Sequence, residues 1–386
     1  MTKYLRFTLV HLWLLAGTIG LFLGGPWLWF GLAFTLTLFV LGDALAGKDI
    51  SVPEYKHTWF FNLMLYSTLP SLLLMLAGVA WAFGTGDPLG IAALVEQHTG
   101  YDMIAARERS TTFDYIGAVF NASILIVLAG TNVGHELTHR TWDPLSLVIG
   151  RWLLAASWDT QFSIEHVYGH HVYMATRKDP ATAIRGESVY RFIIRSTIGQ
   201  IRSAWNIEKR RLQKFDHATW TWRNRILRGH LMSVTLAAGA YAIGGWTGLG
   251  GFLICAIGGK AGLEIINYIE HYGLCRVPDE PVQPRHSWNS NARMSGYTLF
   301  NLTRHSDHHA NGDKPFWKLL PYPDAPMMPY GYITSLLIAL VPPIWKKMMV
   351  PQLNEWDRIH ASQGERIIAQ KQNEESGMPA LMQSVA

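Results

Sequence analysis

The stretch Glu165–His171, E-H-V-Y-G-H-H, places three imidazoles within six positions. On an α-helix His166 and His170 share a face because they are four residues apart, while His171 lies about 100° further round. Three nitrogen donors this close together are rarely packing residues, and neutral imidazole is a good ligand for Fe, Cu, Zn and Ni. We therefore expect this stretch to form one part of a metal site.

Three other places in the chain carry histidines at short spacing. The further candidate ligands are His135 and His139 in H-E-L-T-H, His271 in N-Y-I-E-H-Y-G-L, and His305, His308 and His309 in R-H-S-D-H-H. The first of these, taken alone, matches the zinc-protease pattern with Glu136 as general base. One zinc ion needs three or four ligands, whereas nine of the 16 histidines are gathered here. Nine donors fit two metal ions better than one.

The composition indicates a membrane protein. The 386 residues are 49% hydrophobic and only 16% charged, compared with about 25% charged in soluble domains. Tryptophan and tyrosine, which favour membrane interfaces, are abundant. The two cysteines, Cys255 and Cys275, form no C-x-x-C pair, which argues against a disulfide framework or a built-in rubredoxin-type site. The net charge of +5 requires no nucleic-acid partner.

Hydropathy predicts an all-α membrane protein with one six-span domain over residues 1–353, each span near the roughly 20 residues that a bilayer needs. The predicted spans are residues 8–23, 27–46, 59–83, 113–131, 230–249 and 252–268. Turns are expected at Gly24-Gly25-Pro26 and at Gly248–Gly251. Residues 145–156 are too short to span and are predicted to form a buried or interfacial helix. Residues 354–386 lack a periodic apolar face and are predicted to form a mobile polar tail.

Basic residues predict the orientation. The loop 133–229 holds fifteen lysines and arginines, and by the positive-inside rule this loop and both termini lie in the cytoplasm, with the protein in a bacterial inner membrane. The two regions expected to carry the metal site, 133–229 and 269–330, then lie on the cytoplasmic side.

Polar residues form stripes on two apolar spans. At 100° per residue, one arc of about 60° holds Asp114, Asn121, Asn132, His135 and His139, and another holds Lys260, Glu264, Asn267 and His271. We expect these stripes to face the interior of the bundle, with Lys260 and Glu264 forming an ion pair. An all-imidazole site leaves the metal charge uncompensated, so acidic and amide groups should accept the outer N–H groups of the ligands. The candidates are Glu136, Glu165, Asp179, Glu270, Asp307 and Asn267, and a direct bridging role for one carboxylate stays open.

These motifs resemble the integral-membrane di-iron superfamily of fatty-acyl desaturases and alkane hydroxylases. The finer similarity is to the alkane hydroxylase branch, carried by H-E-L-T-H-R, E-H-V-Y-G-H-H with the following Asp179-Pro180, N-Y-x-E-H-Y-G-L and R-H-S-D-H-H. The C-terminal half also resembles the hydroxylase component of xylene monooxygenases, through Ala325-Pro326 and Glu355-Trp356-Asp357.

The resemblance implies a monooxygenase with two non-haem irons bound by the nine histidines, with no other catalytic residue. It would use O2 to hydroxylate a terminal or benzylic methyl group of an alkane or alkyl-aromatic hydrocarbon. No nucleotide-binding glycine loop follows a strand, so a separate rubredoxin or ferredoxin-type protein must supply electrons. Alternatives are a fatty-acyl desaturase, a membrane zinc protease and a metal transporter. Seven basic residues of the loop 133–229 either dock an acidic electron-carrier protein or only keep this loop on the cytoplasmic side of the membrane. They are Lys209, Arg210, Arg211, Lys214, Arg223, Arg225 and Arg228.

Overall fold

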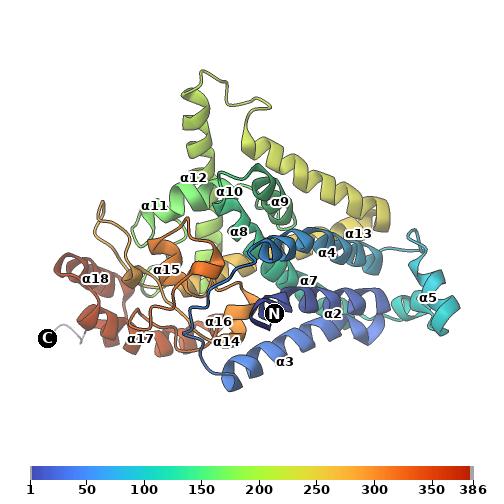
Figure 1. Cartoon of the computed structure of the whole chain (residues 1–386), viewed down its shortest axis with the longest axis horizontal. Coiled ribbons are helices and arrows are strands. Elements are labelled where there is room, and N and C mark those ends of the chain that lie inside the picture. Colours follow the sequence, from blue (N-terminus) through green and yellow to red (C-terminus); the bar gives the residue numbers. More distant parts are fainter. Residues whose placement is uncertain (1, 383–386) are drawn as a thin grey trace. The chain divides into compact units, whose positions relative to one another are not determined.

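The computed structural model describes residues 2–382, and these residues form helices and loops with no β-strand (Figure 1). The expected all-α class is confirmed. The chain divides into two compact units. Unit 1 comprises Met1–Leu38, Tyr55–Thr160 and Thr221–Gly262, and unit 2 comprises Phe39–Glu54, Gln161–Trp220 and Leu263–Ala386.

Unit 1 contains most of the apolar helices. Its elements are α1 (Thr2–Leu5), η1 (Arg6–Thr8), α2 (Leu9–Leu23), η2 (Gly25–Trp29), α3 (Phe30–Leu45), α4 (Trp59–Phe83), α5 (Ile91–Thr99), α6 (Met103–Glu108), α7 (Thr112–Leu125), η3 (Ile126–Thr131), α8 (Asn132–His139), α9 (Pro144–Ala155) and the first part of α13 (Arg225–His271). Helices α2, α4 and α7 pack against one another and appear side by side in Figure 1. The chain turns between α2 and η2 at Gly24, whose φ of 69° is left-handed and favours glycine.

Five helical segments are long and apolar enough to cross a membrane, so the chain is a multi-pass membrane protein. They are Lys3–Leu23, Gly25–Leu45, Trp59–Phe83, Thr112–His139 and Arg225–His271. The first four match the predicted spans closely, and the predicted short helix at 145–156 is α9.

The fifth segment, α13, has 47 residues and covers both of the last two predicted spans. Its one interruption is at Gly245, with φ 61° and ψ −153°. The predicted turn at Gly248–Gly251 is wrong, because those residues remain helical. A Cβ at Gly244 or Gly248 would collide with the carbonyl oxygen of Ala80, so these two glycines permit close helix packing and Gly245 takes the turn.

Unit 2 combines the longer helices α12 and α17 with many short helices and loops. Its elements are α10 (Phe162–Glu165), η4 (His166–His170), α11 (His171–Tyr173), α12 (Val189–Gln213), η5 (Pro284–His286), α14 (Arg293–Thr298), α15 (His305–Ala310), η6 (Phe316–Lys318), α16 (Tyr332–Ala339), α17 (Pro342–Ile359), α18 (Gln363–Ser376) and α19 (Pro379–Met382). The ends of α3 and α13 also belong to it.

The prediction of a mobile tail after residue 354 is wrong for residues 354–382, which form helices packed into unit 2. Trp356 is fully buried and donates its indole N–H to the Arg285 carbonyl. Glu365 is also fully buried and accepts hydrogen bonds from Arg285 and from His286 Nε2, the latter at 2.6 Å. The buried face of α18 is polar rather than apolar, which is why hydropathy does not detect it. Residues 383–386 lie outside the described residues.

Candidate metal centre

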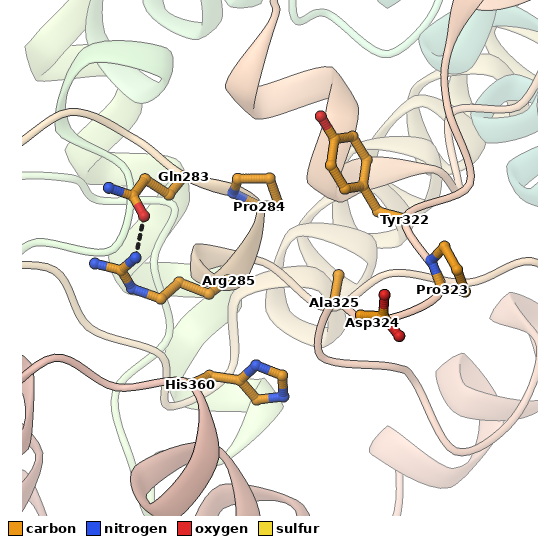
Figure 2. Close-up of a pocket in the computed structure, with 8 residues that line it drawn as sticks. All are labelled: Gln283, Pro284, Arg285, Tyr322, Pro323, Asp324, Ala325 and His360. Atoms are coloured by element: carbon orange, nitrogen blue, oxygen red, sulfur yellow. Dashed lines mark hydrogen bonds between the residues drawn. The ribbon is translucent and has the colours of Figure 1, made fainter.

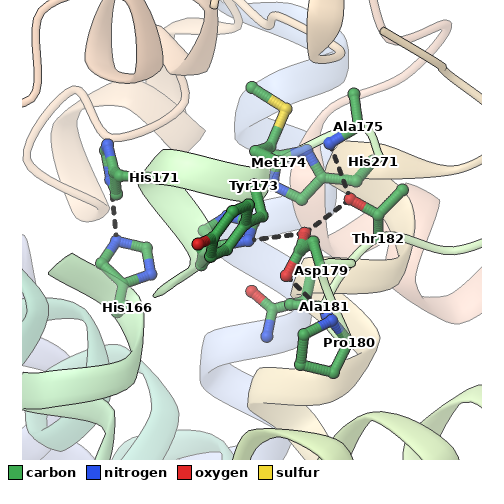
Figure 3. Close-up of polar contacts among 12 residues, drawn as sticks. His166, His171, Tyr173, Met174, Ala175, Asp179, Pro180, Ala181, Thr182 and His271 are labelled. Atoms are coloured by element: carbon green, nitrogen blue, oxygen red, sulfur yellow. Dashed lines mark hydrogen bonds and ion pairs between the residues drawn. The ribbon is translucent and has the colours of Figure 1, made fainter. Parts of the chain in front are cut away.

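The histidine-rich stretch of unit 2 is helical, but not with α-helical pitch throughout. Residues His166–His170 form a π-helical segment, η4, between α10 and α11. The rings of His166 and His170 are stacked with centroids 5.1 Å apart, as expected for residues that share a face, but their ligand nitrogens belong to different groups. A π-helix widens the turn, so residues five apart come together, and the Nε2 atoms of His166 and His171 lie 3.1 Å apart (Figure 3).

His166, His171 and His308 form one group of imidazoles in unit 2. The Nε2 atom of His171 is 3.1 Å from that of His166 and also 3.1 Å from that of His308. The ligand atoms of the three all lie within 4.8 Å of one another. One ring nitrogen facing two others at this distance is the arrangement of side chains directed at a common ion.

His170, His271, His305 and His309 form a second group. The Nε2 atom of His305 lies 3.2 Å from Nε2 of His271 and 2.9 Å from Nε2 of His309. His170 joins them, since its ligand atom lies within 4.8 Å of those of His271 and His309. The ring of His171 stacks on that of His309 with centroids 4.4 Å apart, so the two groups are neighbours.

The imidazole nitrogens of the second group are suited to bind a metal ion. All four imidazoles of the second group are buried, and Nε2 of His170 has no hydrogen-bond partner among the described residues. Burial and the neighbouring imidazoles hold the pKa of His309 well below its usual value, so its ring is neutral and keeps a lone pair for coordination. A buried ring nitrogen without a partner is costly unless it binds something.

Asp179 supports one ligand in the predicted way. Its Oδ2 accepts a hydrogen bond of 2.9 Å from Nδ1 of His170, which leaves Nε2 directed at the centre. Burial disfavours charge on His170, but the Asp179 carboxylate outweighs it and raises the pKa of His170. Asp179 is held in turn by the hydroxyl of Thr182 at 2.6 Å, and that hydroxyl accepts from the backbone N–H of Ala175 (Figure 3).

Glu270 lies beside the inward-facing imidazole nitrogens of the second group. Its Oε2 lies 3.3 Å from Nε2 of His305, and its ligand oxygen groups with His271 and His305 within 4.8 Å. Its Oε1 accepts a 2.9 Å hydrogen bond from the buried hydroxyl of Tyr332. Of the predicted acidic groups, Glu270 has the position needed for a direct contact with a metal.

The other predicted supporting groups lie differently. Asp307 accepts from Lys314, Asn311 and the backbone N–H of Leu320 rather than from a histidine. Asn267 donates to Glu264 at 3.5 Å, and Glu264 also accepts from Gln200 at 2.9 Å.

Glu165 is buried against Gly169, where an added Cβ would lie 2.6 Å from its Oε1. Glu136 accepts from Arg140 at 2.8 Å.

In unit 1, α8 carries His135 and His139, whose Nε2 atoms are 3.2 Å apart. All five residues of the predicted stripe from Asp114 to His139 are buried, as an inward-facing stripe requires, but the π-helical segment η3 interrupts its regular phase. Asp114 caps α7 together with Thr111, and Asn121 donates to the carbonyl of Gly17 at 3.2 Å.

Lys260 also belongs to unit 1, where its amine lies 2.7 Å from Asp159. The pairing of Lys260 with Glu264 stays a prediction.

Sequence reasoning missed Thr182 and Tyr332, which contact Asp179 and Glu270. Neither lies beside a histidine in the chain. Tyr332 is the first residue of α16. The two cysteines are free and buried, in keeping with the absence of a predicted disulfide.

A separate cavity of about 250 Å³ lies in unit 2 (Figure 2). Its polar lining comes from Gln283, Arg285, Tyr322, Asp324 and His360. In Figure 2 the side chains of Gln283 and Arg285 are hydrogen-bonded to each other at its edge. None of the nine predicted ligands lines this cavity.

Comparison with known proteins agrees with the chemistry of the imidazole groups. The fatty acid desaturase family model matches residues 111–334. Alkane 1-monooxygenase 2 of Alcanivorax borkumensis is 32% identical over 86% of this chain and 84% of its own length. Alkane 1-monooxygenase of Ectopseudomonas oleovorans is 33% identical over 92% and 86%. The chain belongs to the alkane 1-monooxygenase group of the fatty acid desaturase family.

The monooxygenase is also similar to a protein that is named for a different substrate. The xylene/toluene monooxygenase hydroxylase component XylM of Pseudomonas putida is 31% identical over 98% of this chain and 97% of its own length. The predicted family and the predicted class of enzyme, an O2-dependent monooxygenase, are confirmed. The family match also includes all nine predicted histidine ligands, since they lie between residues 111 and 334.

Proposed function

We propose that this monooxygenase hydroxylates an unactivated methyl group of a hydrocarbon, either the terminal methyl of an alkane or the benzylic methyl of an alkyl-aromatic compound. The observation that carries the proposal is the convergence of imidazole nitrogens at about 3 Å in unit 2. The names of the relatives supply the substrate class.

We propose that two iron ions are bound by the nine histidines. Within unit 2, His170, His271, His305 and His309 bind one ion, and His166, His171 and His308 contribute to the other. When bound, the two irons supply the redox chemistry that activates O2, which no acid–base site provides. The chain fixes each imidazole through its other ring nitrogen, as Asp179 does for His170. Tyr332 holds the Glu270 carboxylate beside His305, and burial of these groups excludes water.

We propose six spans, with α13 crossing the membrane twice around Gly245. The basic residues of 133–229 support a cytoplasmic position for both termini and for the histidines in the bacterial inner membrane. Such a position would let a hydrocarbon arrive from the lipid and electrons arrive from the cytosol. A separate rubredoxin or ferredoxin-type protein is the proposed electron donor.

The test is conversion of a substrate panel by membranes containing the protein, supplied with ¹⁸O2 and a reduced rubredoxin or ferredoxin system. Octane, hexadecane, xylene and cymene cover both substrate classes. The expected product is an alcohol that carries one ¹⁸O atom. An alkene without ¹⁸O would instead establish desaturation, and no oxidised product from iron-loaded protein with a reduced donor would contradict the proposal.

A further inference from the structure

Helix α12 in unit 2 buries a face on which polar and apolar residues are mixed. Ser196, Gln200 and Glu208 are buried there together with Val189, Phe192, Ala204 and Leu212. Gln200 donates to Ser196 at 2.7 Å and to the Glu264 carboxylate at 2.9 Å. A surface helix of a soluble protein leaves a polar face outside, whereas α12 also exposes Tyr190, Ile194, Ile198 and Ile201.

The outward face of α12 is an apolar stripe. Tyr190, Ile194, Ile198 and Ile201 are exposed, with Ile194 at 65%, and at 100° per residue they fall within an arc of about 80°. The Tyr190 hydroxyl donates to the carbonyl of Leu340 at 2.7 Å, which joins this stripe to the end of α16. Exposed Leu337, Val341 and Ile344 continue the apolar surface there.

Exposed charge beside the stripe is almost entirely basic. Between residues 189 and 220 the exposed charged side chains are Arg191, Arg202, Lys209, Arg210 and Lys214, with Asp216 as the one exposed carboxylate. Beyond α12 the aromatic residues Phe215 and Trp220 are 61% and 77% exposed. An apolar stripe with a basic edge and terminal aromatics is typical of a helix that lies in the membrane interface.

We propose that α12 lies in the plane of the membrane interface, with Tyr190, Ile194, Ile198 and Ile201 in the acyl-chain boundary and its basic edge on anionic lipid headgroups. A large exposed apolar surface marks a contact with either lipid or protein. Because the exposed charges along this edge are almost all positive, we infer that the contact is with anionic lipid. The inference is independent of the reaction, and its failure would leave the proposed hydroxylation untouched.

The experiment measures the depth of a nitroxide at Ile198→Cys by electron paramagnetic resonance. The full-length protein is reconstituted in vesicles of phosphatidylcholine with phosphatidylglycerol. Accessibility to lipid-soluble O2 is compared with accessibility to a water-soluble nickel complex. Asn206→Cys, on the exposed non-stripe side of the same helix, is the matched control. The native cysteines are buried, and the unsubstituted protein measures their background labelling. Ile194→Cys repeats the test if Ile198→Cys does not fold.

The proposal predicts that O2 relaxes the Ile198 label more than nickel does, whereas nickel relaxes the Asn206 label more. It also predicts a deeper Ile198 label in the anionic vesicles than in pure phosphatidylcholine. Equal nickel accessibility at the two sites would overturn the proposal, because the stripe would face water. Protection of the Ile198 label from both reagents would also overturn it, because a second copy or another protein would cover the stripe. If the Ile198 label lay equally deep in pure phosphatidylcholine and in the anionic vesicles, the basic edge would have no role in binding headgroups.

Discussion

Unit 2 contains two histidine triplets, His166–His170–His171 and His305–His308–His309. Both divide their nitrogen donors between the two imidazole groups in the same two-to-one ratio, although they lie on helices of different pitch. In the π-helical segment η4 and the following first residue of α11, His166 and His171 enter one imidazole group and His170 enters the other. In α-helical α15, His305 and His309 share the second group, while His308 reaches across to His171 at 3.1 Å. Each triplet thus contributes two donors to one group and one donor to the other. The pattern teaches that helix pitch, together with spacing, decides which histidines can share an ion.

The triplets differ in how they are supported. His170 is fixed by the Asp179–Thr182 pair, whereas the acidic residue inside the other triplet, Asp307, is bonded to Lys314 and to the Leu320 backbone. The triplet His305, His308 and His309 is held in place instead by a hydrogen bond to the preceding segment. Ser306 donates to the carbonyl of Ser287, which follows the buried His286–Glu365 contact.

Removal of a ligand from either group should have the largest effect. His170→Ala and His308→Ala each delete a donor from a different group, so we expect iron content to fall by about half and hydroxylation to drop to background in both. Elemental analysis and product formation measure the two outcomes. His360→Ala, in the separate cavity, should keep its iron. Full iron and turnover in His170→Ala would contradict the assignment of that ligand.

The unequal support of the triplets predicts unequal effects of two matched amide substitutions. Asp179→Asn should lower iron affinity or activity by about 10- to 100-fold, because His170 loses its charged acceptor. Asp307→Asn should lower the melting temperature by weakening its bonds to Lys314 and Leu320, with little change in iron affinity. Competition with an iron chelator separates the two. Equal iron affinities for the two variants would remove the distinction between the triplets.

The π-helical pitch can be tested at Gly169. A Cβ there would lie 2.6 Å from Oε1 of Glu165 and 3.2 Å from Oγ of Ser203. Gly169→Ala should therefore cost about 1–3 kcal/mol of stability and disturb the approach of His166 to His171. Gly296→Ala is the matched control in α14, because its nearest atom would be at 3.5 Å, an ordinary contact. Thermal unfolding compares them, and a Gly169→Ala protein as stable as Gly296→Ala would show that η4 tolerates a side chain.

The smallest expected effect comes from Glu365 of α18, which contacts the segment that supports the triplet His305, His308 and His309. Burial alone would raise the pKa of Glu365, but hydrogen bonds from His286, Arg285 and the Ser362 backbone outweigh it and hold the pKa at about 2, below its ordinary 4.5. A depressed pKa stabilises the fold fully above the unfolded value and progressively less as pH falls from about 4.5 to about 2. The wild-type protein should therefore have a higher melting temperature than Glu365→Gln at pH 6. The difference between the two melting temperatures should become smaller below pH 4.5. A gap independent of pH would show that Glu365 acts by packing alone.

Much of the chemistry could be predicted from sequence because it depends on residue identity. Spacing marks the nine histidines, and long, mainly apolar runs mark α2, α4 and α7. The pitch of η4 could not be predicted, since five residues of π-helix look like five residues of α-helix in a sequence. The break in α13 was placed a few residues late because several glycines there looked equivalent, and only their packing against Ala80 separates them.

The C-terminal helices and the support of Glu270 were missed for a different reason. Helix α18 buries Glu365, Gln372 and Asn373, so its inner face has no apolar period. Tyr332 reaches Glu270 from 62 positions away, through a hydrogen bond rather than a sequence motif. Contacts between polar groups distant in the chain leave no local signal in a single sequence.

The central claim is that the convergent imidazoles bind two irons. Protein grown on ⁵⁷Fe and purified in detergent can be measured by elemental analysis and Mössbauer spectroscopy on the same sample. The account predicts two non-haem irons per chain in nitrogen-rich sites, with no sulfur ligation. A single zinc per chain with no iron signal after reconstitution would contradict it.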